Sequence, residues 1–168
     1  MLDEPETHLH PQAQEYLKDE LIKITRNDAN NIVFFATHSN YMIDKEHIER
    51  CFRLTKQSNR KTRLEKIELG KTSYSEVNYE VFGIPSSDYH NEHYGYLEDV
   101  EKSKLDGLPK TKKWKNKKSN RTEDVSIATY IRHSIHHPEN TTNAKFTAEE
   151  LEESIKTLRD LKYANKKK

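Results

Sequence analysis

Several classes of protein are excluded by what this sequence lacks. It contains one cysteine, Cys51, which cannot form an internal disulfide, and no apolar run approaches the roughly 20 residues that span a bilayer. Its first residues lack the basic and then apolar order of a signal peptide. We therefore expect a cytoplasmic protein with no membrane segment.

A large net charge is also missing. The sequence has 29 Lys and Arg residues against 28 Asp and Glu residues, a formal net charge of +1, so any surface for nucleic acid must be local. Hydrophobic residues make up 32% of the 168 residues and charged residues 34%. The hydrophobic core is therefore expected to be thin, and much of the surface is expected to be hydrated or to meet a partner.

The first part of the chain shows a strand, helix, strand pattern. Pro11 suits the first turn of a helix that should end near residues 27–30, with an apolar stripe of Tyr16, Leu17, Leu21, Ile22 and Ile24. Residues 32–36 form a short apolar run, typical of a strand buried on both faces of a parallel sheet, and most of the preceding strand is missing before Leu2. Two further strands are expected at residues 51–55 and 63–69, with a turn between them at residues 57–60.

From Tyr74 onward the pattern is helical. Helices are expected near residues 74–82, 88–104 and 127–137, and a last helix begins with a capping box formed by Thr147 and Glu150. The stretch 110–121 contains no acid and little apolar surface, so we expect a solvated linker and a domain boundary there. Alternatively, its lysines could bind a phosphate backbone while Trp114 stacks on a base.

Two adjacent acids follow the first predicted strand. Carboxylates at the end of a buried strand are costly to desolvate and usually serve a cation or a reaction. In phosphoryl transfer one carboxylate holds Mg²⁺, which suits Asp3, and another residue orients the attacking water, which suits Glu4. His38 follows the next strand, so its imidazole is expected beside these acids, where it can hydrogen-bond a γ-phosphate. The plainer alternative is a helix cap and an ordinary polar residue at a strand end.

This order of residues resembles the Walker B motif, D-loop and switch histidine of ABC-type ATPases, particularly the SMC-like and OLD-like branch used in DNA repair and phage defence. The resemblance covers residues 2–44. It implies ATP and Mg²⁺ as cofactors, with Asp3 as the magnesium-side acid, Glu4 as the catalytic base and His38 as the switch. It also implies a D-loop that lies near the nucleotide and touches the opposite subunit, and that includes Glu6, Thr7 and His8.

The phosphate-binding loop of such ATPases is absent from these residues. A P-loop, Gly-x-x-x-x-Gly-Lys-Ser/Thr, cradles phosphates with backbone N–H groups and a lysine. Gly70-Lys71-Thr72 has Glu65 where the first glycine belongs and follows the acids instead of preceding them, so we interpret it as a strand-end turn. We expect either a truncated or split reading frame or a partner chain that supplies the P-loop half. By itself the chain should bind ATP poorly.

A histidine-rich helix end is the second candidate site. Arg132 and His137 resemble the Arg-polar-x-x-x-His motif of HEPN ribonucleases, which are helical, act as dimers and often accompany defence ATPases, although His133 stands where Asn is frequent. The resemblance implies that the arginine holds phosphate and the histidine moves protons. One alternative is a polar helix end with favourably placed cations. Another is a zinc site built from His90, His93, His133, His136 and His137.

We therefore expect an α/β fold in which a partial ABC-type ATPase lobe at residues 1–72 precedes a mostly helical region. That region is divided into a helical segment, a basic linker and a HEPN-like tail, at 73–109, 110–121 and 122–168. The predicted function is hydrolysis of ATP to ADP and phosphate, in a homodimer or with a partner that supplies the P-loop, with nucleic acid as a further partner. The alternatives are a HEPN-like ribonuclease and a non-catalytic, partner-binding remnant.

Overall fold

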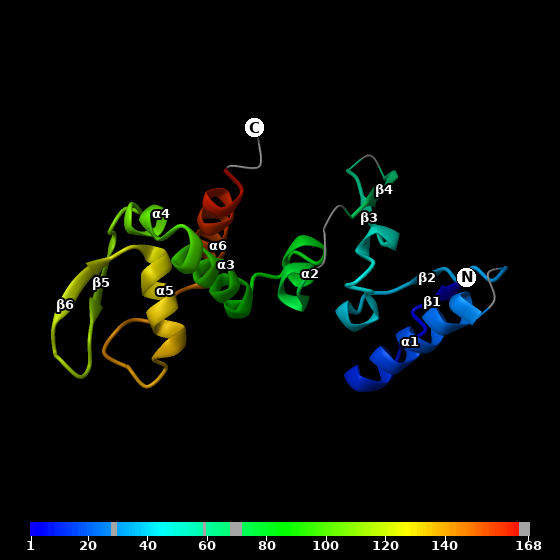
Figure 1. The fold of residues 1–168 in the computed structure, drawn as a ribbon, viewed down its shortest axis with the longest axis horizontal. Helices are drawn as coiled ribbons and strands as arrows, with labels where there is room; N and C mark the ends of the chain where they lie inside the picture. The colour runs from blue at the N-terminus through cyan, green and yellow to red at the C-terminus, as the bar shows by residue number, and fades with distance from the viewer. Residues whose placement is uncertain (28–29, 59, 68–71, 165–168) are drawn as a thin grey trace. The chain divides into compact units, whose positions relative to one another are not determined.

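The computed structural model describes residues 1–27, 30–58, 60–67 and 72–164, and the chain forms two compact units, residues 1–82 and 83–168 (Figure 1). Within the described residues, six α-helices accompany three two-stranded sheets. The predicted α/β class is therefore correct in this coarse sense, but the described strands do not form one extended parallel sheet. The division at residue 82 lies ten residues beyond residue 72, where the ATPase lobe was predicted to end.

The first unit begins with a parallel pair of short strands on either side of a long helix. Strand β1 is Leu2–Asp3 and pairs with β2, Phe35–Ala36. Helix α1 spans Pro11–Asn27, as predicted from Pro11 and the apolar stripe. The remaining elements are two 3₁₀ turns, two strands and a helix: η1 (Asn40–Met42), η2 (Ile48–Arg50), β3 (Phe52–Lys56), β4 (Thr62–Lys66) and α2 (Tyr74–Glu80).

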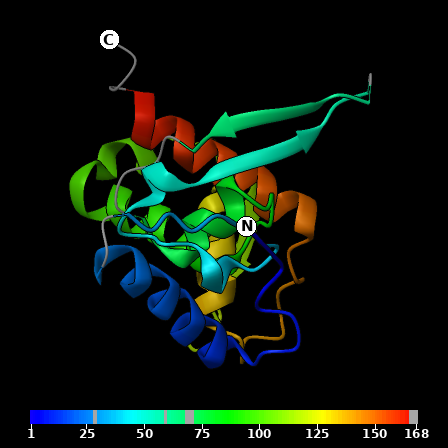
Figure 2. The same ribbon diagram turned by 90° about the vertical axis from the view of Figure 1, so that its right-hand side faces the viewer.

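The two strands expected after the first strand, helix, strand unit are present, and they pair with each other. Strands β3 and β4 are antiparallel, with Leu54 opposite Leu64, and their hairpin projects away from α1 (Figure 2). Residues 68–69 of the predicted strand, residue 59 of the predicted turn, and Gly70 and Lys71 lie outside the described residues.

The core of the first unit is small. Ile43, Ile48 and Val77 are buried together, and η1 contributes Met42, which is fully buried. The expectation that residues 32–36 form a strand buried on both faces is wrong, because only Phe35–Ala36 is a strand and Ile32 is 75% exposed. A two-stranded sheet with two residues in each strand has too little area to bury such a run.

The second unit is mostly helical, with a β-hairpin between its helices. Its elements are, in chain order, α3 (Ser87–Val100), α4 (Lys102–Asp106), β5 (Lys112–Lys115), β6 (Thr122–Val125), α5 (Ile127–His136) and α6 (Ala148–Tyr163). The capping box predicted at Thr147 and Glu150 is present at the start of α6. Helices α3, α5 and α6 pack on one another through a core that includes Tyr94, Leu97, Leu105, Ala128 and Leu158.

The basic stretch 110–121 is not a solvated linker. It includes β5 and the turn that joins it to β6, and Trp114 in β5 is only 3% exposed (Figure 1). The indole packs against Val125 and Tyr130, so it is not available to stack on a base. Among the described residues, no helix is both long and apolar enough to cross a membrane.

Candidate functional site

The parallel pairing of β1 with β2 places the acidic stretch beside the polar residues that follow the second strand. Asp3 lies opposite Ala36, and the backbone N–H of Glu4 donates to the carbonyl of Ala36 at 2.9 Å. Because parallel strands end at the same edge of a sheet, the residues that follow Asp3 and Ala36 meet there. The chain order of these two strands is thus sufficient to bring Glu4 and His38 together.

Glu4 and His38 are in direct contact. The Nε2 atom of His38 lies 3.2 Å from Oε1 of Glu4, and both side chains are open to solvent, at 89% and 48% exposure. The backbone of Glu4 has a φ of 42°, in the left-handed region that non-glycine residues rarely adopt. Such conformations persist where the surrounding structure enforces them, and they concentrate at functional sites. Asp3 is also exposed, so both carboxylates of the motif are accessible to a ligand.

The loop after Glu4 is a compact turn. The backbone N–H and the hydroxyl of Thr7 both donate to the carbonyl of Glu4, at 3.0 and 2.7 Å. His8 has a φ of 68° and Leu9 donates from its N–H to the carbonyl of Glu6 at 3.0 Å. Thr7 and His8 are exposed. The predicted D-loop therefore presents these two side chains to solvent from a backbone fixed by its own hydrogen bonds.

Glu6 differs from its neighbours because it is buried, with 6% exposure. Its Oε1 accepts a hydrogen bond from the Thr37 hydroxyl, and that hydroxyl oxygen accepts one from the Ser39 N–H at 2.9 Å. The other carboxylate oxygen, Oε2, is buried without a hydrogen-bond partner among the described residues. Glu6 thus joins the loop to the segment that carries His38.

One residue that joins the two halves of this site was not found from the sequence. Gln14, in the first turns of α1, donates from Nε2 to the carbonyl of Leu9 at 2.9 Å and accepts a hydrogen bond from the Ser39 hydroxyl at 2.5 Å. It therefore holds the loop and the residues after His38 to the same helix. A glutamine on the polar side of a helix has no local signal for this role.

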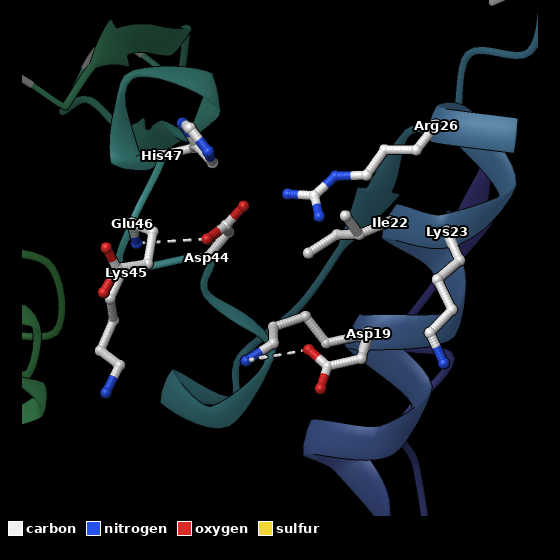
Figure 3. Close-up of a pocket in the computed structure, with 9 residues that line it drawn as sticks. Asp19, Ile22, Lys23, Arg26, Asp44, Lys45, Glu46 and His47 are labelled. Carbon is white, nitrogen blue, oxygen red and sulfur yellow. Dashed lines mark hydrogen bonds and ion pairs between the residues drawn. The ribbon is translucent and has the colours of Figure 1, made fainter.

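A separate pocket of about 390 Å³ lies in the first unit between the C-terminal half of α1 and residues 44–47. In Figure 3, Arg26 extends from α1 toward Asp44 and His47. The lining is almost entirely charged, and Asp3, Glu4 and His38 are not part of it. This pocket is therefore distinct from the predicted catalytic residues, and its own acids and bases largely offset one another.

The two residues predicted to form the tail site have different neighbours. Arg132 lies 4.0 Å from the Glu98 carboxylate, and its guanidinium stands 5.4 Å from the centre of the Tyr94 ring. His137 contacts Glu139 at 3.3 Å instead, and its ring centre lies 6.5 Å from that of Trp114. No hydrogen bond or ion pair joins Arg132 to His137 in this part of the described chain.

The histidines of α3 are core residues. His90 and His93 are 0% and 1% exposed, and His90 Nε2 lies 3.0 Å from the Ser154 hydroxyl on α6. Burial, assisted by the charge of Arg132, lowers the pKa of His90 to about 4. The zinc alternative is wrong for the part of the chain that the structure describes, because no group of three or more His, Cys, Asp or Glu side chains there is placed to hold a metal ion.

Comparison with known proteins identifies relatives of part of the chain. Residues 1–43 match the AAA ATPase domain family. The chain is 34% identical over 92 residues to the Old nuclease of Escherichia phage P2, an alignment that covers 52% of this chain and 15% of that relative. No solved structure matches the chain. The first 43 residues are thus a segment related to AAA ATPase domains, in a chain with distant similarity to Old nuclease.

Proposed function

We propose that residues 1–43 act as the Walker B and switch portion of an ABC-type ATPase that hydrolyses ATP to ADP and phosphate. The observation that carries the proposal is the contact of 3.2 Å between Glu4 and His38 at the shared edge of β1 and β2. In this proposal the Glu4 carboxylate accepts the proton of the attacking water and orients it. His38 holds Glu4 from the opposite strand and donates a hydrogen bond to the γ-phosphate.

The donor set at this edge fits a magnesium nucleotide. Asp3 and Glu4 offer exposed carboxylate oxygens, the ligand type that Mg²⁺ prefers, and Asp3 would hold the ion. When bound, Mg²⁺ neutralises charge that develops on the phosphate oxygens. The exposed Thr7 and His8 are consistent with a D-loop that meets nucleotide or a second subunit.

The proposal requires a phosphate cradle from outside these 168 residues, since they contain no P-loop. A partner chain would supply it, because a second copy of these residues has no P-loop either. Calorimetry of the 168-residue chain with ATP and Mg²⁺ should therefore show little heat. A dissociation constant in the low micromolar range would contradict the requirement for an external P-loop.

The role of Glu4 is tested in a complete ATPase that includes this segment. Glu4→Gln should reduce turnover by at least about 100-fold, because a positioned general base contributes about that much or more, while ATP remains bound. Glu20→Gln is the matched control, since Glu20 is an exposed acid that pairs with Lys23 on α1. Equal turnover of the Glu4→Gln variant and the unmodified enzyme would refute the assignment.

A second candidate function is RNA cleavage at the end of α5. It is favoured by one observation: Arg132 is partly buried against Tyr94, whereas His136 and His137 are exposed at the same helix end. Arg132→Ala and His137→Ala should each abolish cleavage of single-stranded RNA, and His136→Ala tests the histidine one turn from the arginine. Intact RNA after incubation with the unmodified protein would rule out this function and leave a partner-binding role for the tail.

A further inference from the structure

The hairpin formed by β5 and β6, residues 110–125, is attached to the second unit by one face. Its register places Lys113 opposite Asp124 and Trp114 opposite Glu123. Trp114 is buried, with its ring centre 5.2 Å from that of His133, and Lys112 forms an ion pair with Glu150 on α6. Since side chains alternate along a strand, Lys113 and Lys115 occupy the opposite, exposed face.

The tip of this basic hairpin is closed by its own hydrogen bonds. The Asn116 N–H donates to the carbonyl of Arg121 at 2.8 Å, and the Asn116 side-chain oxygen accepts from the N–H groups of Lys118 and Ser119 at 2.9 and 3.1 Å. Asn120 adopts a φ of 56°, which asparagine tolerates in turns. The tip therefore presents its side chains from a defined backbone.

The loop between α5 and α6 binds the edge of the hairpin. The amide groups of Asn140 and Asn143 both donate to the carbonyl of Lys115 at 2.9 Å, and the Lys115 N–H donates to Asn143 at 2.8 Å. Lys117 donates from Nζ to the carbonyl of Glu139 at 3.0 Å. Figure 1 shows this loop beside the tip. The hairpin is thus held to the helices by polar contacts as well as by Trp114.

The charge on this element is one-sided. Residues 110–121 contain seven basic residues and no acid, and the only acids of the hairpin at 110–125 are Glu123 and Asp124 on β6, so its charge is strongly positive although the whole chain is nearly neutral. Within the described chain, Lys112 is paired with Glu150, and Lys113 lies 3.7 Å from Asp124, with both side chains well exposed. An ion pair between two such exposed side chains contributes little to folding stability. Among the described residues, the basic side chains of the hairpin without an ion-pair partner include Lys110, Lys115, Lys118 and Arg121.

We propose that the basic hairpin binds the phosphate backbone of a nucleic acid, a role separate from the proposed ATPase function of the first unit. Exposed lysine, arginine, asparagine and serine side chains on an ordered element are the groups that contact phosphate oxygens without reading bases. The hairpin exposes no aromatic or aliphatic side chain between residues 110 and 121, because Trp114 faces inward. A nucleic-acid backbone therefore suits this surface better than a membrane, which amphipathic elements bind through apolar side chains.

The test compares two triple variants of the 168-residue chain. Lys115→Gln, Lys118→Gln and Arg121→Gln remove three charges from the basic hairpin. The matched control removes the same charge from the β3–β4 hairpin by Lys56→Gln, Lys61→Gln and Lys66→Gln. Binding to fluorescently labelled 20-nucleotide single-stranded RNA, single-stranded DNA and duplex DNA is measured by anisotropy between 50 and 200 mM salt.

The hairpin variant should bind each nucleic acid at least tenfold more weakly at the lower salt concentration, and the control variant should differ from the unmodified chain by less than twofold. The slope of log affinity against log salt on single strands should decrease in magnitude by about 2, since each phosphate contact contributes about 0.7.

Equal losses in both variants, or no binding by the unmodified chain, would overturn the proposal. So would anionic phospholipid vesicles that bind more tightly than every oligonucleotide. A preference among the three oligonucleotides would identify the natural form, and the urea unfolding midpoint of Trp114 fluorescence shows whether the variants fold.

Discussion

The second unit should lose stability in mild acid because two neutral histidines are enclosed between its helices. His90 and His93 are almost completely buried on the face of α3 that packs on α6. Burial and the charge of Arg132 lower the pKa of His90 to about 4, and burial and the charge of Lys162 lower that of His93 to about 4. Both rings are therefore neutral in the folded protein until the solution is distinctly acidic.

The direction of the effect follows from the two states. In the unfolded chain each histidine has a pKa near its ordinary value of 6.5, so below this pH the unfolded chain binds protons that the folded chain excludes. The free energy of unfolding has its full value above about pH 6.5 and decreases as the pH falls toward 4. Each ring accounts for about 3 kcal/mol at the acid end of this window. For two rings the loss is comparable with the whole stability of a small domain, about 5–15 kcal/mol.

Urea unfolding followed by Trp114 fluorescence measures this loss, because Trp114 is the one tryptophan and lies in the second unit. The unfolding midpoint is expected to fall as the pH decreases from about 6.5 to 4.5. The double variant His90→Phe and Ser154→Ala replaces the hydrogen-bonded pair with apolar groups and should remove about half of the pH dependence. His10→Gln, an exposed histidine of the first unit, is the control. A midpoint that is the same at pH 4.5 and pH 7 in the unmodified chain would refute the reasoning.

Two further substitutions test the packing of each unit. Trp114→Ala should destabilise the second unit by about 3–5 kcal/mol, since it removes a buried indole that contacts Tyr130, and thermal unfolding followed by circular dichroism will measure it; a loss below about 1 kcal/mol would indicate that the hairpin is not attached through this residue. Thr37→Val should destabilise the first unit by about 1–3 kcal/mol, because Glu6 loses its hydrogen-bond donor, and should increase amide hydrogen exchange in the loop that contains Thr7. Unchanged exchange there would contradict the role of Glu6 as a link between loop and strand.

The helices could be predicted from the sequence because their signals are local. Pro11 and the apolar stripe predict α1, and the pair Thr147 and Glu150 predicts the start of α6. One predicted helix, residues 88–104, is divided in two at Glu101, where φ is −138°. No glycine or proline marks that break, so the sequence pattern does not reveal it.

The basic hairpin could not be predicted, because lysines occur on both of its faces. Lys112 and Trp114 face the helices while Lys113 and Lys115 face solvent, so an alternation of burial exists without an alternation of hydrophobicity. The burial of Trp114 depends on Tyr130, which lies on a later helix. A stretch that looks hydrated in sequence is therefore ordered by partners that are distant along the chain.

The candidate site shows the same division between local and distant causes. The contact of Glu4 with His38 could be predicted, because two parallel strands that pair in register must end side by side. The burial of Glu6 could not, because it lies in a run of polar residues whose neighbours Thr7 and His8 are exposed, and the sequence does not indicate which side chain turns toward Thr37. The left-handed backbone of Glu4 had no signal either, since glycine or asparagine usually marks that conformation. It is held by the two hydrogen bonds that the Glu4 carbonyl accepts from Thr7, so the loop that follows the proposed catalytic base also fixes its direction.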